Sequence, residues 1–299
     1  TGVSATSSFG VLFGGLSTDI SNITSASGNI TLNGTGNSTA LSYYSGNIKS
    51  TAGGSISLIG NSPAWAGFYQ PYTVNISTTT GNIAISGNGS LGYHGVQLGG
   101  GNITATSGNI SIVGRQNGTK QGVYIVGATN ISTSAGGAIT LNGTAAADTG
   151  VNFAAVTTIT TAGAGAANIY CTSTSYYVMY NSAALNVTTN GAGAVNMCGT
   201  SSSSYGIITD AAVNINSSLG AGAINVCATS STSLAAYIHA NFNLISGAGD
   251  ITMRGVTNST SNPGVHIYSG NITSTTGNIS LTGSTNTGYS GFDYARDTN

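Results

Sequence analysis

One short motif returns at an almost constant interval along this chain. It is an Asn followed by an apolar residue, mostly as NIT or NIS, and successive apolar positions lie 25 to 29 residues apart. These positions form a first column: Ile23, Ile48, Ile76, Ile103, Ile131, Ile159, Val187, Ile215, Leu244 and Ile272. A fixed period of this length indicates a solenoid in which each repeat forms one coil.

Two further apolar columns recur within each repeat, and the residues around them alternate between apolar and polar as in a strand with one buried face. The second column comprises Ile30, Ile56, Ile83, Ile110, Ile139, Ile169, Val195, Ile224, Ile251 and Ile279. The third column comprises Val11, Phe68, Val96, Val123, Val151, Val178, Ile207, Val265 and Phe292, with weaker matches near Tyr43 and Tyr237. Each coil is therefore expected to hold three short strands.

Strands this short and this rich in flanking Gly cannot form hairpins with their neighbours, so each should pair with the equivalent strand of the next coil. The predicted fold is all-β: a right-handed parallel β-helix, or β-solenoid, of about ten coils of roughly 28 residues. A left-handed hexapeptide helix fits less well, because the chain has no six-residue period. We expect residues 1–299 to form a single β-solenoid domain, either a segment of a longer rod or a stacking subunit of a fibre.

The composition supports this fold and excludes several functions. Only 4% of residues are charged, whereas 39% are hydrophobic, which is too many for a disordered chain. A net charge of −1 gives no basic surface for nucleic acid, so we expect no nucleic-acid partner. No apolar run approaches the roughly 18 residues that a membrane helix needs, so we expect no membrane insertion.

The residue before the first column is almost always Asn, and in-register stacking should connect these carboxamides by hydrogen bonds. We predict a structural Asn ladder, interrupted once by Thr158, made of Asn22, Asn47, Asn75, Asn102, Asn130, Asn186, Asn214, Asn243 and Asn271.

The three cysteines are spaced by one coil each. Cys198 and Cys227 occupy matching positions in VNMC and INVC, whereas Cys171 is displaced by one residue. Equivalent positions on adjacent strands lie about 4.8 Å apart, within the Cα separation that a disulfide accepts. The sequence leaves two alternatives open, a disulfide or a ladder of free thiols.

Tyrosines gather on or beside the third strand, whose outward positions are unusually apolar. An exposed apolar stripe commonly marks association, so these positions predict lateral packing between rods or the stacking of carbohydrate, unless neighbouring loops cover them. The candidate lateral interface comprises Leu12, Tyr69, Tyr124, Met179, Ile208 and His266.

Few residues could carry catalysis. The six Asp residues form no close pair across the repeat except Asp293 and Asp297, and His94, His239 and His266 have no partners at metal-ligand spacing. We therefore expect no enzyme activity, no catalytic residue, no cofactor and no metal site.

The ends of the chain are candidates for contact between copies, since a solenoid without a cap exposes unpaired strands. The candidate end-to-end contacts are Phe9, Val11, Phe13, Phe292, Tyr294 and Arg296. A homo-oligomer or polymer is the expected assembly.

Four segments carry a resemblance to a known family: GNITLNG, GNISIVG, GAITLNG and GNISLTG, at residues 28–34, 108–114, 137–143 and 277–283. They resemble the repeats of filamentous-haemagglutinin-like exoproteins, large β-helical proteins of bacterial surfaces, over roughly residues 9–292. The resemblance implies an extracellular or cell-surface rod for adhesion, biofilm or fibre formation. We expect a structural fibre shaft, or alternatively an adhesin module whose Tyr-bearing face binds host or matrix glycans.

Overall fold

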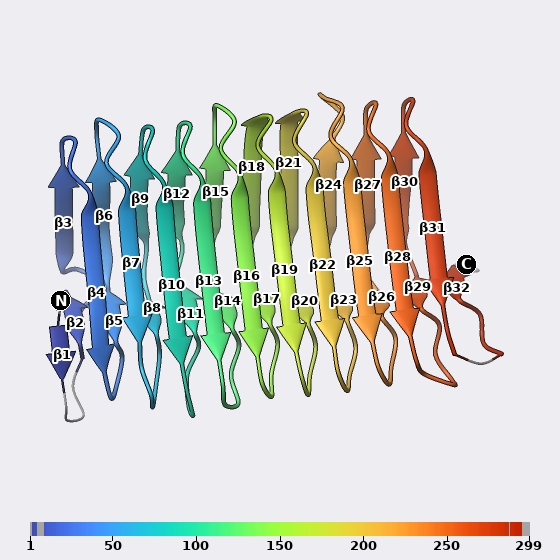
Figure 1. Ribbon diagram of the computed structural model, residues 1–299, viewed down its shortest axis with the longest axis horizontal. Helices are drawn as coiled ribbons and strands as arrows, with labels where there is room; N and C mark the ends of the chain where they lie inside the picture. The colour runs from blue at the N-terminus through green and yellow to red at the C-terminus, as the bar shows by residue number, and fades with distance from the viewer. Residues whose placement is uncertain (1, 5–8, 287, 295–299) are drawn as a thin grey trace.

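The computed structural model describes residues 2–4, 9–286 and 288–294 and folds them into a parallel β-solenoid (Figure 1). Its three sheets contain 11, 11 and 10 strands, and hydrogen-bonded neighbours are always three strands apart in sequence. Every coil therefore gives one strand to each sheet, as the repeat predicts. Among the described residues, no helix is long and apolar enough to cross a membrane.

We name the sheets A, B and C in the order in which the chain meets them. Sheet A comprises β1 (Gly2–Ser4), β4 (Ile30–Gly36), β7 (Ile56–Asn61), β10 (Ile83–Gly89), β13 (Ile110–Gln116), β16 (Ile139–Ala145), β19 (Ala167–Ser173), β22 (Val195–Ser201), β25 (Ile224–Ser230), β28 (Ile251–Thr257) and β31 (Ile279–Ser284). Sheet B comprises β2 (Val11–Phe13), β5 (Leu41–Tyr43), β8 (Phe68–Gln70), β11 (Val96–Leu98), β14 (Val123–Ile125), β17 (Val151–Phe153), β20 (Met179–Asn181), β23 (Ile207–Thr209), β26 (Ala236–Ile238), β29 (Val265–Ile267) and β32 (Phe292–Tyr294). Sheet C comprises β3 (Ile20–Ser25), β6 (Ser45–Ser50), β9 (Val74–Thr78), β12 (Gly101–Ala105), β15 (Thr129–Thr133), β18 (Thr157–Gly163), β21 (Leu185–Gly191), β24 (Val213–Ser217), β27 (Phe242–Ser246) and β30 (Gly270–Ser274).

The winding is right-handed, as predicted from the sequence. In Figure 1 the rod advances from left to right, the near strands of sheet A run downward, and the far strands of sheet C run upward. Each turn therefore passes from the front of the rod through its lower edge to the back, which is the right-handed sense.

The core is a stack of inward side chains that alternate with outward polar ones. In β13 the inward Ile110 and Ile112 are at most 1% exposed, and they pair with the inward Ile139 and Leu141 of the next coil. β-branched residues suit this pleated surface, and full burial of each such side chain stabilises the fold by about 1.5–3 kcal/mol. The core is thin, but it continues from coil to coil.

Glycine fills a crowded position near the end of most sheet A strands, where the chain bends towards sheet B. A Cβ added at Gly114 would lie 2.0 Å from the carbonyl oxygen of Gly122, and one added at Gly143 would lie 2.1 Å from that of Gly150. No side chain fits between backbones this close, so these two coils require Gly. Two other coils are built differently and have Cys171 and Ala228 at the equivalent position.

The second column was misassigned in one coil. The structure pairs Ala167 with Ile139 and Val195, while Ile169 pairs with Leu141 and Met197. Ala167 and Ile169 both face inward and are fully buried. The sequence pattern favours the larger Ile169 because a two-residue shift leaves it on the same face of the strand.

The third column was misassigned in three coils. The structure places Leu41, Met179 and Ala236 in this column, where the sequence had suggested Tyr43, Val178 and Tyr237. Tyr43 is a second inward residue of its strand. Val178 is buried just before its strand, and Ala236 is too small to stand out beside a Tyr.

Candidate functional site

The outward surface of sheet B carries the most varied side chains of the repeat. Each of its strands has three residues, so only the middle one points away from the core. Along the rod this outward column contains Leu12, Ser42, Tyr69, Gln97, Tyr124, Asn152, Tyr180, Ile208, Tyr237, His266 and Asp293. The fold constrains these positions less than the inward ones, so they are the natural place for function.

Aromatic rings cover this surface in two clusters. The first joins Tyr44, Trp65, Tyr69, Tyr72, Tyr93, His94 and Tyr124, with ring centroids 4.5 to 6.2 Å apart. The second joins Tyr176, Tyr177, Tyr180, Tyr205, Tyr237, His239, His266 and Tyr268 at 4.0 to 6.1 Å. Most pairs are tilted or edge-to-face, the arrangements that the charge distribution of aromatic rings favours.

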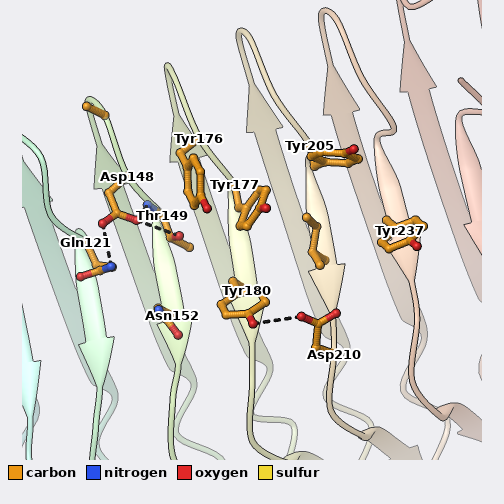
Figure 2. A pocket seen from close by; sticks show the side chains of 12 residues that line it. Gln121, Asp148, Thr149, Asn152, Tyr176, Tyr177, Tyr180, Tyr205, Asp210 and Tyr237 are labelled. Atoms are coloured by element: carbon orange, nitrogen blue, oxygen red, sulfur yellow. Dashed lines mark hydrogen bonds between the residues drawn. The ribbon is translucent and has the colours of Figure 1, made fainter. Parts of the chain in front are cut away.

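A cavity of about 680 Å³ lies where the second cluster begins; we call it the tyrosine groove. Its polar wall is formed by Gln121, Asp148, Thr149 and Asn152. Its aromatic wall is formed by Tyr176, Tyr177, Tyr180, Tyr205 and Tyr237, and Ile208 and Asp210 also line it. Figure 2 shows both walls, with the side chains coming from successive coils.

Asp148 is fixed by its neighbours on the polar wall. Its Oδ2 accepts a hydrogen bond from Gln121 Nε2 at 2.7 Å. Its Oδ1 accepts from the backbone N–H of Thr149 at 2.6 Å and from the Thr149 hydroxyl at 3.1 Å. The carboxylate is therefore held in one orientation (Figure 2).

Asp210 provides the second carboxylate, immediately after β23. Its Oδ2 accepts a hydrogen bond from the Tyr180 hydroxyl at 2.9 Å, and its Oδ1 lies 3.5 Å from His239 Nδ1. Both side chains of this ion pair are about half exposed, so the pair contributes little to stability.

Buried serines at the end of sheet A position the aromatic loops. Ser173 Oγ donates to the carbonyl of Asp148 at 2.7 Å and accepts from the backbone N–H of Tyr176 at 3.0 Å. Ser201 accepts in the same way from Ser204 N–H, also at 3.0 Å, just before Tyr205. These turns connect the groove to the coil beneath it.

Three of the groove tyrosines, Tyr177, Tyr180 and Tyr237, keep their protons at physiological pH. A hydrogen bond with Tyr176, reinforced by burial, raises the pKa of Tyr177 to about 12. A hydrogen bond with Tyr268, again with burial, raises the pKa of Tyr237 to about 12. The pKa of Tyr180 is raised by burial and by its bond to Asp210. These three phenols therefore add no negative charge to the groove at neutral pH.

The arrangement favours binding over two-carboxylate hydrolysis. Asp148 lies before the start of β17 and Asp210 lies after the end of β23. The two residues are therefore two coils apart and at opposite ends of the sheet B strands. Two strand spacings are about 9.6 Å, and the two residues are also separated along the strand direction, so they do not form the close pair, roughly 5–9.5 Å apart, that glycoside hydrolases use. Among the described residues, no group of three or more His, Cys, Asp or Glu side chains could hold a metal ion.

The predicted lateral interface is dispersed, and one member of it was wrong. Met179 is fully buried, because the register of its coil places it in the inward column. Leu12 is 45% exposed, Ile208 is buried beneath the groove, and the His266 side chain, 3.0 Å from Asp293, is 15% exposed. Tyr69 and Tyr124, both half-buried, belong to the first aromatic cluster.

The nine predicted ladder asparagines line up in sheet C. Six carboxamide-to-carboxamide hydrogen bonds of 2.7 to 3.3 Å run along this column, and the Nδ2 groups of Asn47, Asn75 and Asn102 donate three of them. Thr158 separates the two runs and pairs with Asn130 and Asn186, and Asn271 pairs with Asn243.

Sequence reasoning missed a second Asn ladder, on sheet A. Asn196 Nδ2 donates to Asn168 Oδ1 at 2.8 Å, and Asn225 Nδ2 donates to Asn196 Oδ1 at 2.9 Å. The signal was present in ANIYC, VNMC and INVC, whose Asn residues are one coil apart.

Of the two alternatives for the cysteines, the structure has the disulfide. Cys198 and Cys227 are paired across β22 and β25, with Cα atoms 4.5 Å apart. Cys171 pairs with Gly199, one residue out of step, and lies inside the coil as a free thiol. Burial raises the pKa of the Cys171 thiol, which keeps it protonated and unreactive.

The pKa of His94 is strongly perturbed. Burial, and secondarily the charge of Lys120, lowers its pKa to about 4. The unfolded chain therefore binds more protons between pH 6.5 and about 4, so the stabilisation is complete above pH 6.5 and is lost as the pH falls through this window.

We expect the free energy of unfolding to drop by roughly 3 kcal/mol more in the wild type than in His94→Gln between pH 7 and pH 4. Urea titrations at a series of pH values would measure this difference. His239→Gln is the matched control, because its side chain is 58% exposed, and it should keep the wild-type pH dependence. Parallel pH profiles for wild type and His94→Gln would contradict the assignment.

The predicted end-to-end residues lie at both ends of the described rod. Phe9, Val11, Phe13 and Phe292 are half-buried, and Tyr294 is 53% exposed. Arg296 lies outside the described residues. In the last coil the inward Ile279 and Leu281 are 46% and 38% exposed, whereas their partners one coil earlier are fully buried.

The geometry thus defines a parallel β-solenoid, a fold compatible with β-helical repeat proteins, that carries one groove of aromatic, amide and carboxylate side chains. No family model matches the sequence, and no curated protein or solved structure is significantly similar to it.

Proposed function

We propose that this chain is a structural segment of an extracellular rod, the shaft or a subunit of a bacterial surface fibre. The observation that carries the proposal is the unbroken parallel register: all three sheets run through every coil of the described residues without a reversal or a second domain. Such a molecule extends along one axis by stacking equivalent coils, which is the geometry that a shaft requires. The resemblance of its GNI repeats to filamentous-haemagglutinin-like exoproteins agrees with this role.

The disulfide supports an extracellular location. Cys198 and Cys227 form a covalent bond between adjacent strands, both partly accessible to solvent. Disulfides persist in oxidising compartments and at cell surfaces, and are rare in the reducing cytosol.

End-to-end stacking of copies would extend the rod. The exposed inward Ile279 and Leu281 present an apolar strand edge of the kind that another coil would cover. Electron microscopy of the concentrated chain should show filaments far longer than one molecule. Dispersed short rods at high concentration would rule out self-assembly.

A matched pair of variants tests whether the edge is responsible. We expect Ile279→Asp to abolish the filaments, because it places a charge in the apolar contact. Leu219→Asp, at a residue 77% exposed in the turn after β24 and away from the ends of the rod, should leave them intact.

Glycan binding through the Tyr-bearing face is the second candidate function, and the tyrosine groove favours it. Open clefts with aromatic platforms and hydrogen-bonding amides suit sugar rings, which present apolar faces and polar edges. A glycan array should give hits for the wild type that Tyr177→Ala loses. Tyr170→Ala, an exposed Tyr outside the groove, should retain them. An array with no hits above background would remove this candidate.

A further inference from the structure

The tyrosine groove contains an acceptor atom that its own side chains leave unused. Asn152 Oδ1 is shielded from solvent and accepts no hydrogen bond from the described residues, whereas the side chain of Gln121 interacts with His94. Asn152 and Gln121 both line the polar wall (Figure 2). A shielded acceptor without a donor is unfavourable, so a ligand rich in N–H or O–H donors would satisfy Asn152 Oδ1.

Two carboxylates add negative charge to this acceptor. Asp148 is held by Gln121 and Thr149, and Asp210 is held by Tyr180 on the far side. Among the described residues, the only basic side chain within ion-pair distance of either carboxylate is His239. The groove therefore keeps an excess of negative charge wherever His239 is neutral.

The aromatic wall suits a cation as well. The rings of Tyr177, Tyr180 and Tyr237 lie in one connected cluster beside Asp210, and Tyr faces attract ammonium groups. The phenols of Tyr177 and Tyr237 each have a pKa of about 12, so both rings stay neutral and able to attract a cation across the usable pH range.

The groove is elongated along the rod. Its lining runs from Gln121, beside β14, to Tyr237 in β26, which is four coil steps. At the strand spacing of a sheet this amounts to about 19 Å. A single small cation would occupy only part of it, whereas an extended chain of several sugar units would follow it from end to end.

We propose that the tyrosine groove binds a linear glycan whose sugar units carry protonated amino groups. This proposal rests on the second candidate function and adds the charge of the ligand. Ammonium groups donate to Asp148, Asp210 and the unpaired amide oxygen of Asn152, while ring faces pack on the tyrosines. A uronic-acid glycan would bring like charge against both carboxylates and is excluded.

Calorimetry with the full chain tests the ligand class. The probes are a glucosamine oligomer, its fully N-acetylated counterpart of the same length, a uronic-acid oligomer and choline. The glucosamine oligomer should bind at least tenfold more tightly than the neutral N-acetylated one, and the uronic-acid oligomer should not bind.

Charge-removing variants test the residues. Asp148→Asn and Asp210→Asn should each weaken glucosamine-oligomer binding by at least tenfold and reduce its preference over the N-acetylated oligomer. Asp250→Asn is the matched control: Asp250 accepts from Asn278 N–H at 2.7 Å in a turn where Asn109 makes the equivalent bond in another coil. Circular dichroism confirms folding, and either groove variant alone suffices if the other does not fold.

The outcomes separate this inference from the function on which it rests. Equal binding of the N-acetylated and free-amine oligomers overturns the charge assignment and leaves glycan binding standing. Choline binding without oligomer binding overturns the assignment of a sugar ligand. Failure of every oligomer, together with an empty glycan array, overturns both proposals.

Discussion

Replacing Phe153 with Ala should lower the free energy of unfolding by about 3–5 kcal/mol, the usual cost of emptying a Phe site in a core that cannot collapse around it. Phe153 is completely buried in β17, midway along the rod, between Ile125 and Asn181 of the adjacent coils. The surrounding backbone is tied into three sheets, so the cavity has little room to close.

The same change should also divide the rod into parts that unfold separately, because each coil of a solenoid contacts only its neighbours. Trp65, the only Trp, reports on the amino-terminal coils, whereas circular dichroism reports on the whole rod. In Phe153→Ala the urea midpoint measured by Trp fluorescence should differ from the midpoint measured by circular dichroism, which marks a departure from two-state unfolding.

Phe153→Leu is the matched variant, since it keeps an apolar side chain in the same place and should cost less than half as much. A loss below 1 kcal/mol for Phe153→Ala would contradict the thin, rigid core described above.

The second large effect concerns the disulfide. Reduction of Cys198–Cys227 should lower the free energy of unfolding by roughly 3–4 kcal/mol, because the bond closes a loop of 29 residues, which is one full coil. Both sulfur-bearing side chains are partly exposed, so a mild reductant reaches them without unfolding the chain. The midpoint of urea unfolding, with and without dithiothreitol, measures the change.

The double variant Cys198→Ala with Cys227→Ala supplies the control. It should unfold like the reduced wild type and should not respond to reductant. Cys171 remains in both proteins as a free thiol, which dithiothreitol does not change, so a response of the double variant would show that the reductant acts elsewhere than on the Cys198–Cys227 bond. Identical midpoints for oxidised and reduced wild type would show that the bond contributes nothing to stability.

Architecture was predictable from the sequence because the fold is periodic and the period is visible. The distance between one Asn-Ile pair and the next defines the coil, and alternation on either side defines which face is buried. At Ile169 and Tyr237 the error arose because a larger residue lies one or two places from the small Ala that occupies the column. At Val178 a β-branched residue precedes the flexible Met179 that occupies it. Periodicity gives the spacing of coils, whereas the exact register inside a coil depends on packing.

The candidate site was only half visible. The excess of Tyr pointed to the correct face, since rings stacked at a fixed spacing leave a compositional trace. Gln121, Asp148 and Asn152 left none, because their importance comes from lying beside those rings in adjacent coils. The unused amide oxygen of Asn152 is also a property of geometry that residue identity does not reveal.

The outward column of sheet B has a consequence for how such a rod changes over time. Each coil contributes one side chain to it, at a step of about 4.8 Å, and the core beneath depends on other positions. Asn152 lies between Tyr124 and Tyr180 in this column, and its strand β17 still pairs in register with β14 on one side and β20 on the other. Selection or protein engineering can therefore change this surface one residue at a time while the coil spacing and the core stay the same.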